Sequence, residues 1–181
     1  HFMTDTLHRI GRMDVADADD LARSLRQLDA LLTLCSEHID HENRFVHAAI
    51  EARQPRGASR TADDHIEHLD SIDALRAEAH ALAAAPATER DLPALRLYRH
   101  LALFVAENFQ HMHVEETHNN AALWAVYSDA ELIEVHHRIV GSLPLDETLV
   151  VARWMVPALT PAERVQVVGG MKAAPAAVFQ A

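Results

Sequence analysis

Two short stretches of the sequence combine histidine and carboxylate side chains at the same spacing. The stretch HIDHE covers residues 38–42 and HMHVE covers residues 111–115, so each has a histidine followed four residues later by a glutamate. Side chains four residues apart in an α-helix lie on one face, one turn above the other. Imidazole nitrogens together with carboxylate oxygens suit iron or manganese. The two stretches are therefore candidate halves of a metal site.

The angular position of a side chain around the helix axis, its helical phase, distinguishes residues that face the core from residues that face solvent. We apply it to the first stretch and to the residues that follow it. At about 100° per residue, Glu42 lies about 25° and His38 about 65° from the centre of the apolar stripe, which directs both toward the core. His41 and His47 lie beyond about 110° and are predicted to face solvent. The prediction for this helix therefore rests on His38 and Glu42.

Two further segments supply inward candidates. In DDHIEH, His65 lies within about 10° of the stripe centre and His68 about 50° from it, so His65 is the better candidate. In the last long segment, His111 lies near the edge of the stripe, about 90° off, and Glu115 and Glu116 are about equally close to the stripe. Glu115 is preferred because it repeats the spacing of the first stretch.

Helical periodicity of apolar residues runs through four long segments, and no segment alternates as a β-strand would. Abundant alanine and leucine also favour helix. Short connections between long amphipathic helices predict antiparallel neighbours, so we expect an all-α fold, an up-down antiparallel four-helix bundle. The expected helices cover residues 1 to about 13, about 18–53, about 62–85 and about 92–127.

The remainder of the chain carries the start signals of shorter helices. SDAE at residues 128–131 and TPAE at residues 160–163 both have the form of a capping box. We expect a bundle over residues 1–127 and a C-terminal helical extension, packed on the bundle, over residues 128–181. The short helices of this extension are expected at about 130–140, 145–155 and 162–172.

Composition limits the class of protein. The 181 residues suffice for one domain, and 16 Lys and Arg against 27 Asp and Glu give a formal charge of −11, which repels nucleic acid and anionic lipid. No apolar run reaches the roughly 18 residues of a membrane span, and no signal peptide is visible. The single cysteine, Cys35, excludes an internal disulfide. We expect a cytoplasmic protein that binds neither nucleic acid nor membranes.

Histidines and glutamates directed into a core from several helices need partners there. An unpaired buried ionisable group costs roughly several kcal/mol, and a dinuclear metal site between facing helices would supply the partner. For any single histidine, a surface position or a hydrogen-bonded core position is the more common explanation. Two histidine–glutamate pairs on inward faces, with His65 between them, favour a metal instead.

The order of these residues resembles that of bacterial hemerythrin-like proteins, also called HHE cation-binding domains. In the branch that includes iron-centre repair proteins, the four helices carry in turn one histidine, HxxxE, one histidine and HxxxE. Residues 38–42, His65 and residues 111–115 match the last three elements. The phrases HENRFVHAAIEAR and HMHVEETHNNAALW are also similar to the family. The resemblance covers about residues 1–127.

The resemblance implies an iron cofactor with two irons per chain. The histidines would supply terminal nitrogens, and the glutamates would bridge the metals while leaving a coordination position for O₂ or NO. The implied metal ligands are His38, Glu42, His65, His111 and Glu115. Candidates for orienting the imidazoles through their other nitrogen are Asn108, Tyr98 and His68.

Two positions depart from the family pattern. Where oxygen carriers have a second histidine on the third helix, this chain has Leu69, which implies more room for water or an exogenous ligand. His1 and His8 lie about 165–175° from the stripe of the first helix, so neither is expected to reach the core. The next inward position falls about five residues before His1. We expect the first-helix ligand there, and incomplete or replaced iron in a chain without it.

Several functions remain open at this point. The resemblance favours a non-haem diiron protein that binds or senses O₂, NO or iron. A diiron enzyme or an iron donor, acting on peroxide or NO or in iron–sulfur repair, would use the same ligands, whereas a helical interaction module would need no metal. No nucleophile triad or phosphate loop indicates another enzyme class, and Cys35 and Ser36 beside His38 look like helix neighbours. The oligomeric state is also open, with a homo-oligomer among the alternatives.

Overall fold

The computed structural model describes residues 1–173, and the side chains of residues 1–170. Almost all of this part of the chain is helical, and it contains no β-strand, which confirms the all-α prediction. The α-helices are α1 (Phe2–Gly11), α2 (Ala18–His41), α3 (Ala48–Arg53), α4 (Ser59–Ala84), α5 (Asp91–Val114), α6 (Asn120–Val126), α7 (Asp129–Ser142), α8 (Leu145–Ala158) and α9 (Pro161–Ala173).

Two of the helices continue through a π-helical segment into the next one. α2 runs into η1 (Glu42–His47) and then α3, while α5 runs into η3 (Glu115–Asn119) and then α6. The combined helices cover residues 18–53 and 91–126, in agreement with two of the predicted segments. Both π-helical segments begin at a glutamate that the sequence indicates as a ligand.

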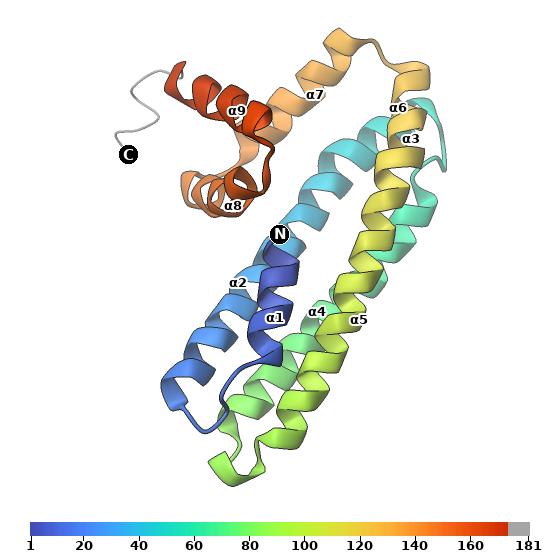
Figure 1. Ribbon diagram of the computed structural model, residues 1–181. Helices are drawn as coiled ribbons and strands as arrows, with labels where there is room; N and C mark the ends of the chain where they lie inside the picture. Colours follow the sequence, from blue (N-terminus) through green and yellow to red (C-terminus); the bar gives the residue numbers. More distant parts are fainter. Residues whose placement is uncertain (174–181) are drawn as a thin grey trace. The chain divides into compact units, whose positions relative to one another are not determined.

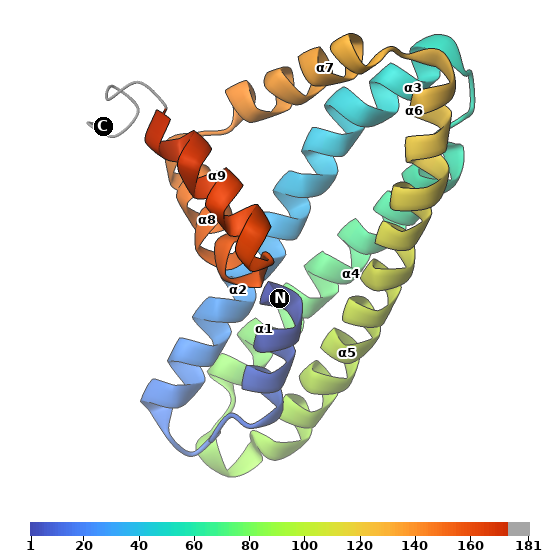
Figure 2. The same cartoon turned by 45° about the horizontal axis from the view of Figure 1, so that its top comes forward.

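Helices α1, α2, α4 and α5 lie side by side and form a helical bundle (Figure 1). α1 packs against α2 and α5, α2 packs against α4, and α4 packs against α5, an arrangement that Figure 2 shows from a second direction. Phe2, Thr6 and Ile10 form the buried face of α1. His1 and His8 are exposed, as the helical phase predicted.

The buried residues change character along the bundle. One part of the core is rich in leucine, and Leu28, Leu75 and Leu101 from three helices have no exposed surface there. The adjoining part of the bundle is polar and holds the buried histidines. Beyond it lies an apolar cluster from α3, α6 and α7 that includes Ile50 and Leu123. The polar part therefore has apolar neighbours on two sides, which exclude water and lower the local dielectric constant.

Three large apolar residues of α4 and α5 are exposed. The exposed fractions of Ile66, Leu69 and Met112 are 62%, 38% and 39%. α4 turns His65 and His68 inward, and Ile66 and Leu69 each follow one of these histidines by one residue, about 100° further round the helix. Met112 follows a buried histidine of α5 in the same way. These apolar residues face outward because polar side chains occupy the inward face at this level of the bundle.

α7 belongs to the same compact unit as the bundle, which extends from Phe2 to Ser142. Val135 of α7 is buried in the apolar cluster with α3 and α6, and Leu132 and Ile139 pack beside it. The unit therefore continues past the predicted boundary at residue 127, because α7 has an apolar face that α3 and α6 cover.

Both predicted capping boxes are confirmed. At the start of α7, the backbone N–H and the hydroxyl of Ser128 each donate to the Glu131 carboxylate at 2.8 Å. At the start of α9, the same groups of Thr160 donate to the Glu163 carboxylate at 2.9 and 2.7 Å. Each glutamate thus satisfies a donor at a helix start that has no partner within its helix.

Residues 143–173 belong to a second unit, in which α8 packs against α9. Residues 174–181, the last part of the predicted extension, lie outside the described residues. Among the described helices, none combines the length and the hydropathy that crossing a bilayer requires.

Candidate metal centre

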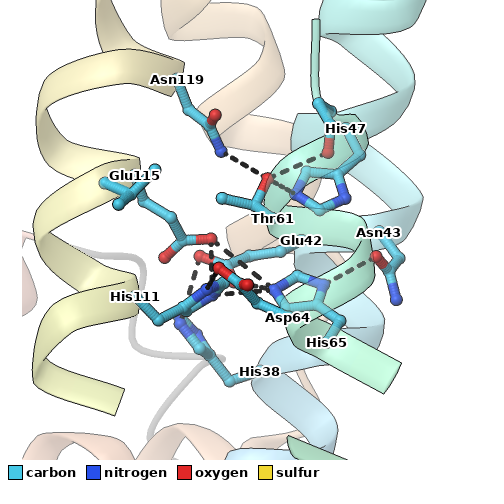
Figure 3. A network of polar contacts seen from close by, with 12 residues as sticks. His38, Glu42, Asn43, His47, Thr61, Asp64, His65, His111, Glu115 and Asn119 are labelled. Atoms are coloured by element: carbon cyan, nitrogen blue, oxygen red, sulfur yellow. Dashed lines mark hydrogen bonds and ion pairs between the residues drawn. The ribbon is translucent and has the colours of Figure 1, made fainter. Parts of the chain in front are cut away.

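Four ionisable side chains from three continuous helices converge in the polar part of the core. Glu42 begins η1, His65 lies on α4, His111 lies in the last turn of α5, and Glu115 begins η3. Each offers one ligand atom, and these atoms all lie within 4.8 Å of one another (Figure 3). His65 is 1% exposed and His111 is 6% exposed. A buried group of this composition could hold a metal ion.

The contacts within the group centre on His65. Its Nε2 lies 3.0 Å from Nε2 of His111, 3.4 Å from Oε2 of Glu42 and 3.7 Å from Oε1 of Glu115. The same oxygen of Glu115 is 3.1 Å from Nε2 of His111. The two imidazoles therefore direct the same nitrogen toward each other and toward the carboxylates.

The other ring nitrogen of each histidine already has a partner. Nδ1 of His65 donates to Oδ1 of Asn43 at 2.8 Å, and Nδ1 of His111 donates to Oδ2 of Asp64 at 3.2 Å. A neutral imidazole carries one proton, so both Nε2 atoms are bare acceptors when both rings are neutral. Two bare nitrogens 3.0 Å apart, facing two carboxylates, repel one another unless a cation lies among them. That cation can be a proton or a metal ion.

The pKa values show how the group holds a proton. Burial lowers the pKa of His65, but the carboxylates of Glu115 and Glu42 outweigh burial and raise it to about 9. Burial also lowers the pKa of His111, and the contact with Glu115 reverses this, so that this pKa is raised as well. Burial raises the pKa of Glu42, but hydrogen bonds from His38 and His65 hold it well below its usual range. The group therefore stabilises positive charge at its centre.

His38 lies at the edge of the group rather than within it. Its side chain is 59% exposed, and its Nε2 is 3.2 Å from Oε1 of Glu42, a contact that raises the pKa of His38. His38 is more exposed than its helical phase predicted, because Ile39 takes the inward position. Glu42 has one oxygen facing His38 and the other facing His65. Glu42 therefore links the exposed His38 to the buried His65.

Because η1 is π-helical, the side chain of His47 points into the core on the same side as Glu42. In an α-helix, His47 would lie on the solvent side, as its phase predicted. In a π-helix the hydrogen bonds span five residues, so the fifth residue after Glu42 returns to about the same side. His47 is accordingly 6% exposed, and the prediction that it faces solvent was wrong. Single π-helical turns of this kind are frequent at functional sites.

His47 supports the ring of His65. The two imidazoles stack with their centroids 4.7 Å apart and an interplanar angle of 13°. Nε2 of His47 lies 3.0 Å from the Thr61 hydroxyl, which also accepts a hydrogen bond from Nδ2 of Asn119 at 3.1 Å (Figure 3). Burial lowers the pKa of His47, so this ring stays neutral beside the charged centre. Thr61 therefore joins both π-helical segments to α4.

Replacing Thr61 by valine is expected to lower the free energy of unfolding by about 1–3 kcal/mol, because the donors of His47 and Asn119 lose their shared partner in a buried site. Urea unfolding followed by circular dichroism measures the change. Thr33, which is exposed on α2, provides the matched control, and its valine variant should stay within about 0.5 kcal/mol of the unmodified protein. Equal midpoints for the two variants would contradict this role of Thr61.

The remaining candidates from the sequence take different positions. Glu115 points into the group whereas Glu116 is exposed, so the inward glutamate is the one with the predicted spacing. His68 is 5% exposed, and its ring meets that of His111 edge-on with centroids 4.9 Å apart. Burial raises the pKa of the Cys35 thiol to about 12, so at neutral pH it is not a thiolate nucleophile.

The residues that orient the imidazoles were missed in the sequence. Asn108 donates to a backbone oxygen of its own helix at 2.8 Å, and Tyr98 packs against Gly11, where a Cβ would come within 2.8 Å of its ring. Neither therefore orients a histidine of the group, and Asn43 and Asp64 do so instead. Each is the immediate sequence neighbour of a member of the group, which is the one signal that could have indicated it.

Comparisons with protein-family models, with curated proteins and with solved structures find no match to this chain. The function of the group must therefore follow from its own geometry. The features on which a function can be argued are the imidazole nitrogens and carboxylates that point into the group, their burial, and the hydrogen bonds that fix the imidazole rings.

Proposed function

We propose that this chain is a hemerythrin-like non-haem iron protein with two irons per chain, which binds or senses O₂, NO or iron itself. Glu42, His65, His111 and Glu115 hold the metal, and His38 completes the ligand set at the exposed edge. Iron with such ligands supplies a centre that binds small diatomic molecules. The protein's own contribution is to hold the donor atoms in place and to keep water out.

The observation that carries the proposal is the pair of Nε2 atoms of His65 and His111, 3.0 Å apart. A proton between them satisfies one hydrogen bond, whereas a metal ion accepts a lone pair from each nitrogen and neutralises the carboxylates as well. The contacts from Asn43 and Asp64 to Nδ1 are of the kind that fix the tautomer and the orientation of metal-bound histidines.

The arrangement of the helices supports the same proposal. We assign α1, α2, α4 and α5 to an up-down antiparallel four-helix bundle of the hemerythrin-like kind. Dinuclear carboxylate sites are built between the facing helices of such bundles. Here one histidine–glutamate pair stands where α2 meets η1, the other stands where α5 meets η3, and His65 lies on α4.

Metal analysis after anaerobic loading with Fe²⁺, followed by absorption spectra with O₂ and with NO, tests the proposal. The expected result is about two irons per chain and new visible bands when either gas is added. Protein that retains no iron after removal of the excess would contradict the metal site. Iron-loaded protein whose spectrum neither gas changes would contradict the binding of diatomic ligands.

Replacing Asn43 by alanine is expected to weaken metal affinity by about 10- to 100-fold, because the His65 ring loses the acceptor that fixes its orientation. Competition with a chelator of known affinity measures this. Asn120→Ala is the matched control, since the Asn120 side chain donates to a backbone oxygen of its own helix, Glu116 O, and not to a histidine of the centre. Equal affinities for the two variants would show that Asn43 does not position His65.

A further inference from the structure

A pocket of about 190 Å³ opens between α4 and α5, directly beside the candidate metal centre. Asp64 and Glu67 of α4 and Glu107 of α5 line it, together with Arg60, so carboxylates outnumber the one guanidinium. His111 also lines this pocket. His111, a member of the candidate metal centre, therefore forms part of the pocket wall.

The carboxylates of the pocket differ in depth. Glu67 and Glu107 are exposed and stand on facing helices, where they meet ions from solvent. Asp64 is half-buried and accepts the hydrogen bond from Nδ1 of His111, as Figure 3 shows. The negative side chains thus lead from solvent to the ring of His111.

His68 provides a second and independent indication of a ligand. It lines the pocket although only 5% of its surface is exposed, and its Nδ1 has no hydrogen-bond partner among the described residues. Leaving a buried donor or acceptor unsatisfied destabilises the folded state. The ring lies between Phe104 and His111, with centroid distances of 6.0 and 4.9 Å. His68 therefore places a ring nitrogen next to the metal centre, although His68 is not one of the ligands proposed for that centre.

We propose that this pocket captures a divalent cation from solvent and passes it to the buried centre. Glu67 and Glu107 supply the first oxygen ligands, and His68 supplies a nitrogen ligand beside His111. An oxygen-rich, partly hydrated site binds such ions weakly, whereas the imidazole nitrogens of the centre bind transition metals more strongly, which gives the transfer its direction. This inference rests on the metal-binding function proposed above.

The rate of Co²⁺ uptake by the full chain tests the pocket. The protein is first made metal-free and is then mixed with Co²⁺. Stopped-flow absorption follows the visible band of Co²⁺ as the ion enters the protein. The double variant Glu67→Gln with Glu107→Gln is expected to take up Co²⁺ about tenfold more slowly, because the local field that concentrates cations is weakened. The control, Asp63→Asn with Asp70→Asn, removes the same charge from exposed positions of α4 outside the pocket and should change the rate less than about twofold.

The possible outcomes separate the two proposals. Slower uptake in the pocket variant alone, with the same final amount of Co²⁺, supports the transit role. Equal rates for pocket and control variants overturn it and leave the metal centre standing. A lower final amount of Co²⁺ in the pocket variant also overturns it, because the two glutamates would then be permanent ligands. An unmodified protein that binds no Co²⁺ removes the metal centre, and the pocket proposal with it.

Discussion

Replacing Glu42 or Glu115 by alanine is expected to weaken iron binding by at least about 100-fold, more than the loss of a residue that only orients a ligand. The reason is that each carboxylate serves two histidines. Glu42 lies 3.2 Å from Nε2 of His38 and 3.4 Å from Nε2 of His65, and Glu115 contacts both His65 and His111. Anaerobic titration with Fe²⁺, with the bound metal determined by elemental analysis, measures the loss.

Glu116→Ala is the control for both variants. Glu116 is exposed, adjacent to Glu115, and of the same charge, so its loss changes the overall charge equally without touching the centre. Iron binding should be unaffected in this variant. If Glu116→Ala were the damaging change, the inward register of η3 would be wrong, and full iron binding by both Glu42→Ala and Glu115→Ala would remove the site.

The second large effect is on pH. Without metal, His65 holds a proton at neutral pH, because its pKa is raised to about 9. A metal ion must displace that proton, so metal affinity should fall about tenfold for each pH unit below the pKa. Competition titrations with Co²⁺ between about pH 6.5 and 8.5 measure the slope, and calorimetry in buffers of different ionisation enthalpy counts the protons released. A flat profile would show that His65 is neutral in the metal-free protein.

The same proton also affects the stability of the metal-free protein. Lowering the pH is expected to increase this stability, whereas it is expected to lower the metal affinity. The folded pKa of His65, about 9, lies above the ordinary histidine pKa of 6.5, so protonation favours the folded state. This stabilisation is fully present below about pH 6.5 and is lost as the pH rises through 9, which amounts to about 3 kcal/mol. Urea unfolding across this range measures the loss. Glu115→Gln should flatten the dependence, because it removes a carboxylate that raises the pKa.

The positions of the helices could be predicted because their signals are local. Pro86 follows shortly after the end of α4, and a glutamate at each capping box binds the donors three residues before it. The spacing of His38 and Glu42, and of His111 and Glu115, was likewise readable, since residues four apart share a helical face. These features depend on a few consecutive residues and not on the neighbouring helices.

The contacts between helices could not be predicted in the same way. His47 reaches the core through the π-helical turn of η1, which no single residue type signals. Asn43 and Asp64 orient histidines that lie 22 and 47 residues away in the chain. Their roles depend on how closely the helices pack, and helical phase contains no information about that distance.

The amino-acid sequence by itself determined that the chain is helical, where the long helices run, and which histidine–glutamate pairs could hold a metal. The tertiary structure decided which atoms meet. It placed His65 and His111 with their Nε2 atoms 3.0 Å apart, left His38 at the exposed edge, and opened an acidic pocket beside them. The physical reason is that a pattern of residues gives the direction of a side chain from its own helix axis. Its partners depend on the packing of the other helices and on the extra residue in each π-helical turn.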